Sequence, residues 1–280
     1  MACRAHRDWA AGGDGEQYGG GLQGGGVGVM IGTLRLSVTL RASLPICINP
    51  SKMLRRELFV KASPSMSPLQ RKIISEEKIR SIGLPIHPHL PLVEAEDEVQ
   101  LRTEEEILRR LIALWAVAGT AMLRENPHFR EYIIDNQLQR WLSKRELEFL
   151  LCATPGENQY IQFSWQLEAL YFIAWCAGLI DCIEIPVQES SVKAIMHLFP
   201  EDKEAPNHLR TAIRVRTKSE VLDQADLLYR LHWAVRNSRL KGDATQLPVN
   251  PGVVQEWHRA VNWVIRYDQE DNWDYVATDT

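Results

Sequence analysis

Apolar residues recur at steps of three and four over most of the chain after position 100, and this spacing places them on one face of an α-helix. The first such run follows Thr103 and Glu106, which have the spacing of a helix capping box. Its apolar positions are Ile107, Leu111, Leu114, Trp115 and Ala118. We therefore predict a long amphipathic helix that begins after Thr103.

Two more helix starts follow before residue 150. Pro127 suits the first turn of a helix, where its missing N–H is not needed, and the apolar positions after it are Phe129, Ile133, Ile134 and Leu138. Ser143 and Glu146 repeat the capping-box spacing, so a third helix is predicted to begin there.

The segment from Tyr160 to Ile180 is apolar on most sides and contains Gly178, a residue type that commonly ends a helix. An all-round apolar helix is buried, so we predict this segment to be the central helix of the fold. A shorter helix is predicted from Ser190 to Phe199, closed by Pro200, with an exposed linker over residues 201–207.

Two long helices are predicted near the end of the chain. Thr217 and Glu220 form another capping-box pair, and the helix that they begin continues to about Leu240 and stops near Gly242. Its apolar positions are Val221, Ala225, Leu228 and Val235. Asn250 before Pro251 is a favoured start for the next helix, whose apolar positions are Val253, Trp257, Ala260, Val261 and Val264.

These patterns predict a mainly α fold: a compact, bundle-like single domain of several helices over residues 66–280, with at most short extended segments. Strand signals are confined to residues 183–187 and 212–215. Hydrophobic residues make up 45% of the chain and charged residues 24%, a balance that permits a sizeable core. The longest apolar stretches, residues 111–123 and 170–180, are shorter than the roughly 20 residues of a membrane-spanning helix, so no span is predicted.

The first 65 residues differ from the rest. Eleven of the seventeen glycines precede Thr33, and such a segment has little apolar surface to bury, so we predict that it is disordered. Residues 30–65 are basic and rich in Ser and Leu, with Glu57 as the one acidic residue, which is typical of an organellar transit peptide. The alternative is an upstream extension without a role, with Met30, Met53 or Met66 as the true start.

Charge and cysteine content bear on partners and compartment. Residues 66–280 carry 24 Lys and Arg against 32 Asp and Glu, so a net acidic domain disfavours nucleic acid as a partner. Cys152 and Cys176 lie in apolar helical patterns and are expected to be buried thiols, which favours a reducing, intracellular compartment. We expect a cytoplasmic protein, or a plastid or mitochondrial one if residues 30–65 act as a transit peptide.

Three blocks of sequence resemble one family. They are Ile161-Gln-Phe-Ser-Trp-Gln-Leu-Glu-Ala-Leu170, Asp226-Leu-Leu-Tyr-Arg-Leu-His-Trp-Ala-Val-Arg236 and Asn250-Pro-Gly-Val-Val-Gln-Glu-Trp-His-Arg-Ala-Val-Asn-Trp263, and they are similar to the domain-of-unknown-function family 4272. The likeness extends over about residues 70–280, including the acidic end Asp271-Asn-Trp-Asp-Tyr-Val-Ala-Thr-Asp-Thr280. The resemblance supports the domain limits and implies no chemistry.

The candidate pocket lies on the last two long helices. We expect side chains of both helices to face one another there, and the set is His232, Trp233, Arg236, Trp257, His258, Asn262 and Trp263. A partly buried imidazole can carry a proton near neutral pH, and a guanidinium can clamp an anion. The alternative is a structural network in which His232 and His258 bond to the backbone, Asp226 or Glu256.

Other polar patterns predict less. Asp226 and Arg230 have the spacing of an exposed intrahelical ion pair, and Arg259 is placed to stack on Trp263. His87 and His89 flank a proline without further ligands at a diagnostic spacing, so we predict no metal site. Phosphate-binding glycine loops and a Gly-x-Ser-x-Gly elbow are missing after residue 65, and no cofactor is predicted.

Two classes of function remain. The first is a non-catalytic helical module that binds a protein partner or a small ligand. The second is an enzyme of unfamiliar class that uses His232, Arg236 and His258 in a tryptophan-lined pocket. A cavity on which these three side chains converge would favour the enzyme, and packed, mutually satisfied side chains would favour the module.

Overall fold

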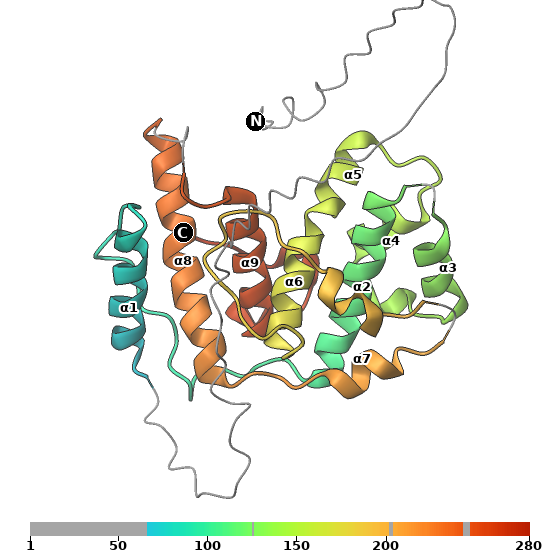
Figure 1. Ribbon diagram of the computed structural model, residues 1–280, viewed down its shortest axis with the longest axis horizontal. Coiled ribbons are helices and arrows are strands. Elements are labelled where there is room, and N and C mark those ends of the chain that lie inside the picture. Colours follow the sequence, from blue (N-terminus) through green and yellow to red (C-terminus); the bar gives the residue numbers. More distant parts are fainter. Residues whose placement is uncertain (1–65, 125, 202–203, 243–246) are drawn as a thin grey trace, which may run out of the picture. The chain divides into compact units, whose positions relative to one another are not determined.

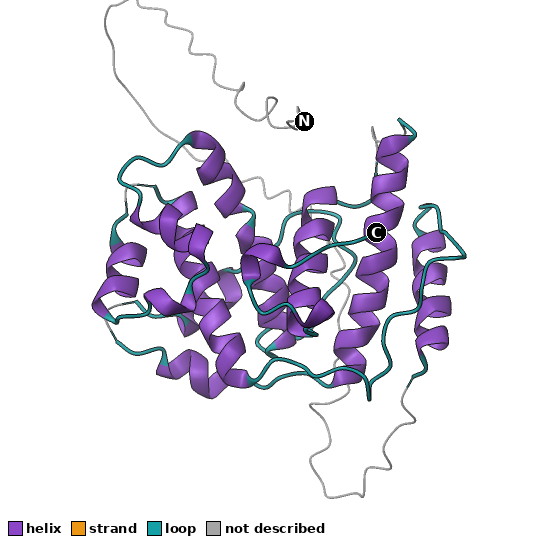
Figure 2. Ribbon diagram, turned by 180° about the vertical axis from the view of Figure 1, so that it is seen from behind, coloured by secondary structure: helices purple, strands orange, loops and turns teal. Residues whose placement is uncertain are grey.

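The computed structural model describes residues 66–124, 126–201, 204–242 and 247–280, and within these ranges it contains nine α-helices and no β-strand. The helices are shown in Figure 1, and Figure 2 shows the same chain from behind, drawn as helices and loops without a strand. They are α1 (Pro68–Ser81), α2 (Glu104–Met122), α3 (His128–Asp135), α4 (Lys144–Leu151), α5 (Glu157–Ser164), α6 (Gln166–Cys176), α7 (Asn207–Ala212), α8 (Lys218–Leu240) and α9 (Pro251–Val264).

The mainly α prediction is thereby confirmed for the described part of the chain. The segment predicted to be disordered, residues 1–65, lies outside the described residues, and so does the transit peptide predicted within it. Among the described residues, no helix combines the length and the apolar character that crossing a bilayer requires.

Capping boxes begin the helices α2, α4 and α8, as predicted. At α2 the Thr103 hydroxyl accepts a hydrogen bond from the backbone N–H of Glu106, and the Glu106 carboxylate accepts one from the N–H of Thr103. Ser143 and Thr217 form the same reciprocal pairs at α4 and α8. The side chain of Asn250 accepts hydrogen bonds from two backbone N–H groups in the first turn of α9. These four starts are fixed by residues within one turn of each other.

The helices pack against one another in the order α1, α8, α9, α6 and α2, and α2 is also in contact with α3, α4, α5 and α7 (Figure 1). The main core lies between α2, α6 and α9, where Leu111, Phe172 and Val261 are fully buried. Burying a side chain of this size stabilises the fold by roughly 1.5–3 kcal/mol relative to leaving it exposed. Helix α6 contacts α2 and α9, which confirms its predicted central place.

Gly178 ends the central segment, as predicted. Its φ is +72°, and the N–H of Leu179 donates to the carbonyl oxygen of Ala174 at 3.0 Å, so the last turn closes around it. A Cβ atom at this position would lie 2.6 Å from the carbonyl oxygen of Arg214. Both the left-handed backbone and the close approach of the following chain therefore require glycine.

The prediction of one continuous helix from Tyr160 to Ile180 was wrong, because the segment forms two helices. At Trp165 the carbonyl oxygen accepts from the N–H of Glu168, three residues on, so the regular ladder of the α-helix is interrupted between α5 and α6. The ring of Trp165 lies against Gly252 of α9, where an added Cβ would come within 2.7 Å of it. Contact with a distant glycine is not visible in local spacing.

The loops between α6 and α8 also differ from prediction. Residues 190–199 do not form an α-helix, and a 3₁₀ helix covers Lys193–Leu198 instead. Part of the linker predicted over residues 201–207 lies outside the described residues, and α7, which was not predicted, begins at its end. Residues 183–187 and 213–215 are loops, and Ala212 is the last residue of α7. Cys176 is buried as predicted, but Cys152 is only half-buried because α4 ends just before it.

Helix α1 was not predicted either. Ser67 and Gln70 form a capping box, and Pro68 opens the helix. The side chains of Leu69 and Ile73 are exposed, whereas Arg71 is buried, so the apolar pattern gives no helical signal. Arg71 is buried in place of these apolar side chains because its hydrogen-bond partners lie far along the chain.

Candidate functional site

The two predicted histidines meet in the interface between α8 and α9. Their Nδ1 atoms lie 2.9 Å apart, and both side chains are buried. His232 faces inward with Val221, Leu228 and Val235, as its place on the same stripe of α8 predicted. His232 and His258, which were predicted to lie on facing helices, therefore face each other.

The hydrogen bonds around the pair determine which nitrogens carry protons. The amide nitrogen of Asn262 donates to the carbonyl oxygen of Ala277 at 2.9 Å, so this group is also the donor toward Nε2 of His258, 3.3 Å away. His258 then carries its proton on Nδ1 and donates it to Nδ1 of His232. The remaining proton of His232 lies on Nε2. Both imidazoles are neutral in this arrangement.

Burial also keeps the pair neutral. It lowers the pKa of His258 to about 3, with a smaller contribution from the neighbouring His232. Burial lowers the pKa of His232 to about 4, assisted by the positive charges of Arg236 and Arg239. Protonating either ring would place a charge where water does not compensate it. A proton carrier that works near neutral pH needs a higher pKa than either ring has.

Trp257, the residue before His258 on α9, faces helix α6 instead of α8. The indole N–H of Trp257 donates to the carboxylate of Glu168 on α6 at 3.2 Å, and its ring stacks on Tyr171. Burial raises the pKa of Glu168 above its ordinary value, although the hydrogen bonds from Ser190 and Trp257 oppose this shift. Burial also raises the pKa of Glu256 to about 7. Trp257 thus belongs to the α6–α9 contact.

The other predicted side chains diverge as well. Trp233 is half-buried with its ring edge-on to His87, whereas Arg236 is exposed and donates to the hydroxyl of Thr280 at 2.8 Å. Trp263 lies under the guanidinium of Arg102, 4.8 Å from the ring centre. Of the seven predicted residues, the structure brings together His232, His258 and Asn262 and separates the others.

A cavity of about 400 Å³ lies elsewhere, where the first turns of α2 meet the segment before α4 and the end of the chain. We call it the arginine–tryptophan pocket. Of the predicted set, only Trp263 lines it. Its lining residues are Arg102, Glu106, Arg109, Arg110, Arg140, Trp141, Leu142, Ser143, Lys144, Trp263, Asp271, Asn272 and Trp273. Five of these carry a positive charge and two carry a negative charge.

Each tryptophan of this pocket is paired with an arginine. The guanidinium of Arg110 lies 4.7 Å from the ring centre of Trp273, and that of Arg259 lies 4.4 Å from the same ring. Arg109 lies 6.0 Å from the ring of Trp141. Such contacts are worth roughly 0.5–2 kcal/mol each, depending on exposure to water. The predicted stacking of Arg259 on Trp263 was wrong, because Trp273 returns along α9 and takes that place.

Three buried donors around the pocket lack a partner. They are the indole N–H groups of Trp141 and Trp273 and the Nε–H of Arg110, none of which has an acceptor among the described residues. The side chains of Arg110 and Trp273 are almost fully buried. An unsatisfied buried donor costs roughly 1–3 kcal/mol, so three in one lining form an uncommon concentration.

Most of the pocket's cations have carboxylate partners. One nitrogen of Arg110 bonds both oxygens of Glu146, which is fully buried, at 2.5 Å each. Arg109 pairs with Glu105 at 3.0 Å. Lys144 is exposed, and its Nζ lies as far as 3.9 Å from the carboxylate of Glu148. Arg140 is exposed as well and has no ion-pair partner in the described part of the chain. The positive charge left for a ligand is therefore close to that of one or two side chains.

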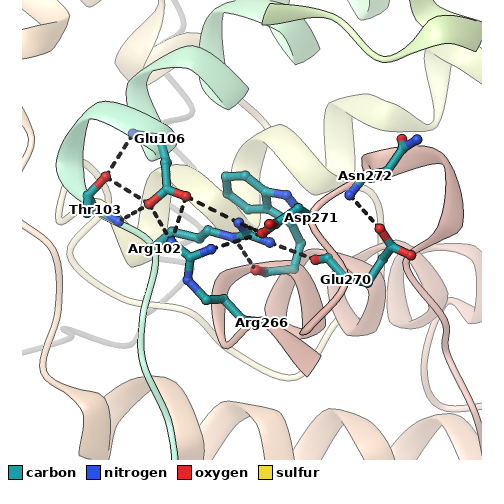
Figure 3. A network of polar contacts seen from close by, with 8 residues as sticks. Arg102, Thr103, Glu106, Arg266, Glu270, Asp271 and Asn272 are labelled. Carbon is teal, nitrogen blue, oxygen red and sulfur yellow. Dashed lines mark hydrogen bonds and ion pairs between the residues drawn. The ribbon is translucent and has the colours of Figure 1, made fainter. Parts of the chain in front are cut away.

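A polar network closes one side of the pocket, and Figure 3 shows it. The buried guanidinium of Arg102 donates to Glu106, to Asp271 and to the carbonyl oxygen of Glu270. Arg266 donates to both oxygens of Glu106, at 2.7 and 2.8 Å, and to Asp271 at 2.9 Å. Burial alone would raise the pKa of Glu106, but hydrogen bonds from Thr103, Arg102 and Arg266 outweigh it and lower that pKa to about 2.

The chain after α9 passes through this network as a strap, residues 270–280. Between α9 and the strap, Arg266, Asp268 and Gln269 have φ values of 57°, 54° and 56°, in the left-handed region. Each such residue costs roughly 1–2 kcal/mol. Further along, the carboxylate of Asp274 accepts from the hydroxyl of Ser143 at 2.6 Å and from the N–H of Arg145 at 3.1 Å. The strap is thus bound to the start of α4.

Sequence reasoning missed this pocket and misjudged one ion pair. Asp226 and Arg230 were predicted to be exposed, but both are buried, and two nitrogens of Arg230 bond the carboxylate at 2.7–3.1 Å. Arg71 of α1 is buried because it bonds Asp223 and Glu96. Two features of the sequence could have indicated the pocket. They are the adjacent Arg140 and Trp141, and the acidic, tryptophan-bearing end of the chain. Among the described residues there is no group of three or more His, Cys, Asp or Glu placed to hold a metal ion.

Comparison with known proteins identifies a family. A family model described as "Domain of unknown function (DUF4272)" matches residues 71–276. The match covers the pocket, the histidine pair and most of the strap. No curated protein and no solved structure gives a significant match.

Proposed function

Because the chain belongs to the DUF4272 family, whose description names no activity, we propose a function from the arginine–tryptophan pocket: the domain is a non-catalytic module that binds a small anionic ligand. The observation that carries this proposal is the set of three buried, unpartnered N–H donors on residues that line the pocket. A ligand with acceptor oxygens would satisfy them once these side chains turn toward the cavity. A volume of about 400 Å³ suits a small molecule.

Charge defines the ligand more closely. Arg140 and Lys144 are the least neutralised cations of the lining, and both are exposed to solvent. A carboxylate or phosphate in the cavity would form charge-assisted hydrogen bonds with cations of this lining, and such bonds are stronger than neutral ones. The three tryptophans favour a ligand that also carries an apolar or planar part. We therefore propose a small organic anion with one acidic group.

The enzyme alternative requires His232, Arg236 and His258 to converge on an open cavity. The two imidazoles instead contact each other below the surface, and Arg236 engages Thr280. None of these three residues lines the arginine–tryptophan pocket, and none lines a further cavity of about 390 Å³ beside Asn237 and Leu247. This arrangement supports a binding module rather than an enzyme built on the histidine pair.

The test is calorimetric titration of the full chain with benzoate, phenyl phosphate, acetate and the neutral analogue benzamide. The anions with a ring should bind, and benzamide should not. Replacing Arg140 with Ala should weaken anion binding by roughly tenfold, because a charge-assisted hydrogen bond is lost. Arg145→Ala is the matched control, since Arg145 is an exposed neighbour outside the lining.

Trp141→Phe separates the donor from the ring. It removes an unpartnered indole N–H and keeps an aromatic side chain at the pocket. Weaker binding of phenyl phosphate to this variant would agree with a donor role. Equal affinities of the Arg140→Ala and Arg145→Ala variants, or binding of benzamide as tight as that of benzoate, would contradict the proposal.

The compartment remains a prediction from the sequence: intracellular, and organellar if residues 30–65 act as a transit peptide. A fluorescent reporter fused after residue 65 tests the second part. Diffuse cytosolic fluorescence would contradict a transit peptide.

A further inference from the structure

Asp271 occupies a position that an external anion would also favour. Its carboxylate bonds Arg102, whose side chain is only 3% exposed, and also Arg266, 2.9 Å away. The side chain of Asp271 itself is 75% exposed. Two guanidinium groups thus hold an acidic side chain that is open to solvent at the edge of the arginine–tryptophan pocket (Figure 3).

We propose that Asp271 is an internal carboxylate that holds the place of the ligand's acidic group, and that the ligand displaces it from Arg102 and Arg266. This inference rests on the proposed function and names its regulation. The ligand class follows from the exchange, because the displaced group is a carboxylate whose Oδ1 accepts from two guanidinium groups. A carboxylate or a phosphate presents the same geometry to them.

The charges at this edge make Asp271 the exchangeable partner. Arg102 and Arg266 face two carboxylates, those of Glu106 and Asp271. Glu106 also accepts the N–H and hydroxyl of Thr103 at the start of α2, so it is fixed by the helix. Asp271 lies in the strap, and within the described part of the chain its carboxylate bonds only Arg102 and Arg266. When Asp271 leaves, one uncompensated positive charge remains for the ligand.

The backbone beside Asp271 is suited to the exchange. Arg266, Asp268 and Gln269 all have left-handed φ values, and a displaced segment would be released from this conformation. The strap stays attached on the far side, because Asp274 bonds Ser143 and the N–H of Arg145 at the start of α4. Trp273 stays buried between them. The movement is therefore confined to residues 267–271.

The experiment compares Asp271→Asn with Asp268→Asn in the full chain, by calorimetric titration with benzoate and with inorganic phosphate. Asp271→Asn keeps the side-chain shape and removes the competing charge, so we expect both probes to bind about tenfold more tightly than to the natural chain. Asp268 lies in the same turn outside the network, and its variant should bind like the natural chain. Unchanged or weaker binding to Asp271→Asn would overturn the inference.

A second measurement covers the case in which Asp271→Asn folds poorly. Hydrogen exchange of residues 267–271 in the natural chain should become faster when benzoate saturates the pocket, because the segment is released. Slower or unchanged hydrogen exchange at saturation would overturn the proposal that the ligand displaces Asp271. If benzoate, phosphate and phenyl phosphate bind neither protein, the proposed function itself fails. If the natural chain binds them in an Arg140-dependent way without these changes at Asp271, only the present inference fails.

Discussion

His232 and His258 face each other through their Nδ1 atoms, which lie 2.9 Å apart, so one proton serves both atoms. The donor is His258, because its Nε2 accepts from Asn262. Asn262 in turn bonds the carbonyl oxygen of Ala277 in the strap. The contact therefore joins α8, α9 and the strap through neutral, directional hydrogen bonds inside the fold.

Replacing His232 with Ala should destabilise the protein by roughly 1–3 kcal/mol, because the buried Nδ1–H of His258 loses its acceptor. Urea unfolding monitored by circular dichroism measures this change. His208→Ala is the control, since His208 is exposed on α7 and its loss should change the free energy of unfolding by less than about 0.5 kcal/mol. Equal stabilities of the two variants would contradict a structural role for the pair.

The histidine pair should also make stability depend on pH. The pKa values of His232 and His258 are about 4 and about 3 in the folded state, below the ordinary value of 6.5. Between these values the unfolded chain binds more protons than the folded one, so the free energy of unfolding rises with pH from about 3 to about 6.5. Each imidazole contributes up to about 1.4 kcal/mol per pH unit within its own window.

The double variant His232→Gln, His258→Gln isolates this contribution. The carboxyl groups, including Glu256 with its opposite dependence, remain in both proteins and cancel in the comparison. The difference in unfolding free energy between the natural chain and the variant should therefore grow as pH rises from 4 to 6.5 and stay constant above it. A difference that is independent of pH would contradict the lowered pKa values.

Glu146→Gln should be one of the most damaging single changes. Glu146 is fully buried and bonds Arg110 with both oxygens, and removing one partner of a buried pair costs roughly 3–5 kcal/mol. Glu157→Gln is a matched control, because Glu157 pairs with Arg124 at the surface, where water screens the pair, so its loss should lower stability far less. Thermal unfolding of both variants measures the contrast, and similar losses would contradict it.

Gly178→Ala and Gly83→Ala separate backbone strain from steric conflict. Both glycines have positive φ, +72° and +80°, so both variants carry the left-handed penalty of roughly 1–2 kcal/mol. Only at position 178 does the new Cβ also meet a backbone oxygen, that of Arg214 at 2.6 Å, whereas nothing lies within 4 Å at position 83. Gly178→Ala should therefore be clearly the less stable variant in urea unfolding.

The features that the sequence could predict are those whose interacting residues lie close together along the chain. Thr103 with Glu106 and Thr217 with Glu220 are bonded within one turn, so their residue types alone indicate a helix start. Helix α1 has a capping box as well, but its buried face includes Arg71, which depends on partners 25 and 152 residues away. Local apolar spacing cannot indicate a face that is buried through charge pairing.

Helix geometry explains why only part of the predicted residue set comes together. His232 and His258 were placed on facing helices, and they meet. Trp257 and His258 are consecutive residues of α9, however, and consecutive side chains of an α-helix point about 100° apart. They therefore face different neighbours, α6 and α8. A list of polar and aromatic residues from two helices was too broad for one face.

The arginine–tryptophan pocket could not be derived from spacing, because its parts come from three distant segments. Arg102, Trp141 and Trp273 belong to the start of α2, the segment before α4 and the strap. The contact of Arg102 with Trp263 at the end of α9 and the return of the strap bring them together. The acidic, tryptophan-bearing end of the chain is visible in the sequence, but nothing local indicates which arginines it contacts.

The capping-box hydrogen bonds at the starts of α2 and α8 affect which part of the fold is lost first as the pH falls. Hydrogen bonds outweigh burial and lower the pKa of Glu106 to about 2, and those from Thr217 and Arg216 likewise lower the pKa of Glu220. Acidification to pH 3 therefore charges the imidazoles of the α8–α9 interface before it opens the first turn of α2. Side-chain packing at this interface should therefore be lost first, and far-ultraviolet ellipticity should outlast the near-ultraviolet signal of the tryptophans.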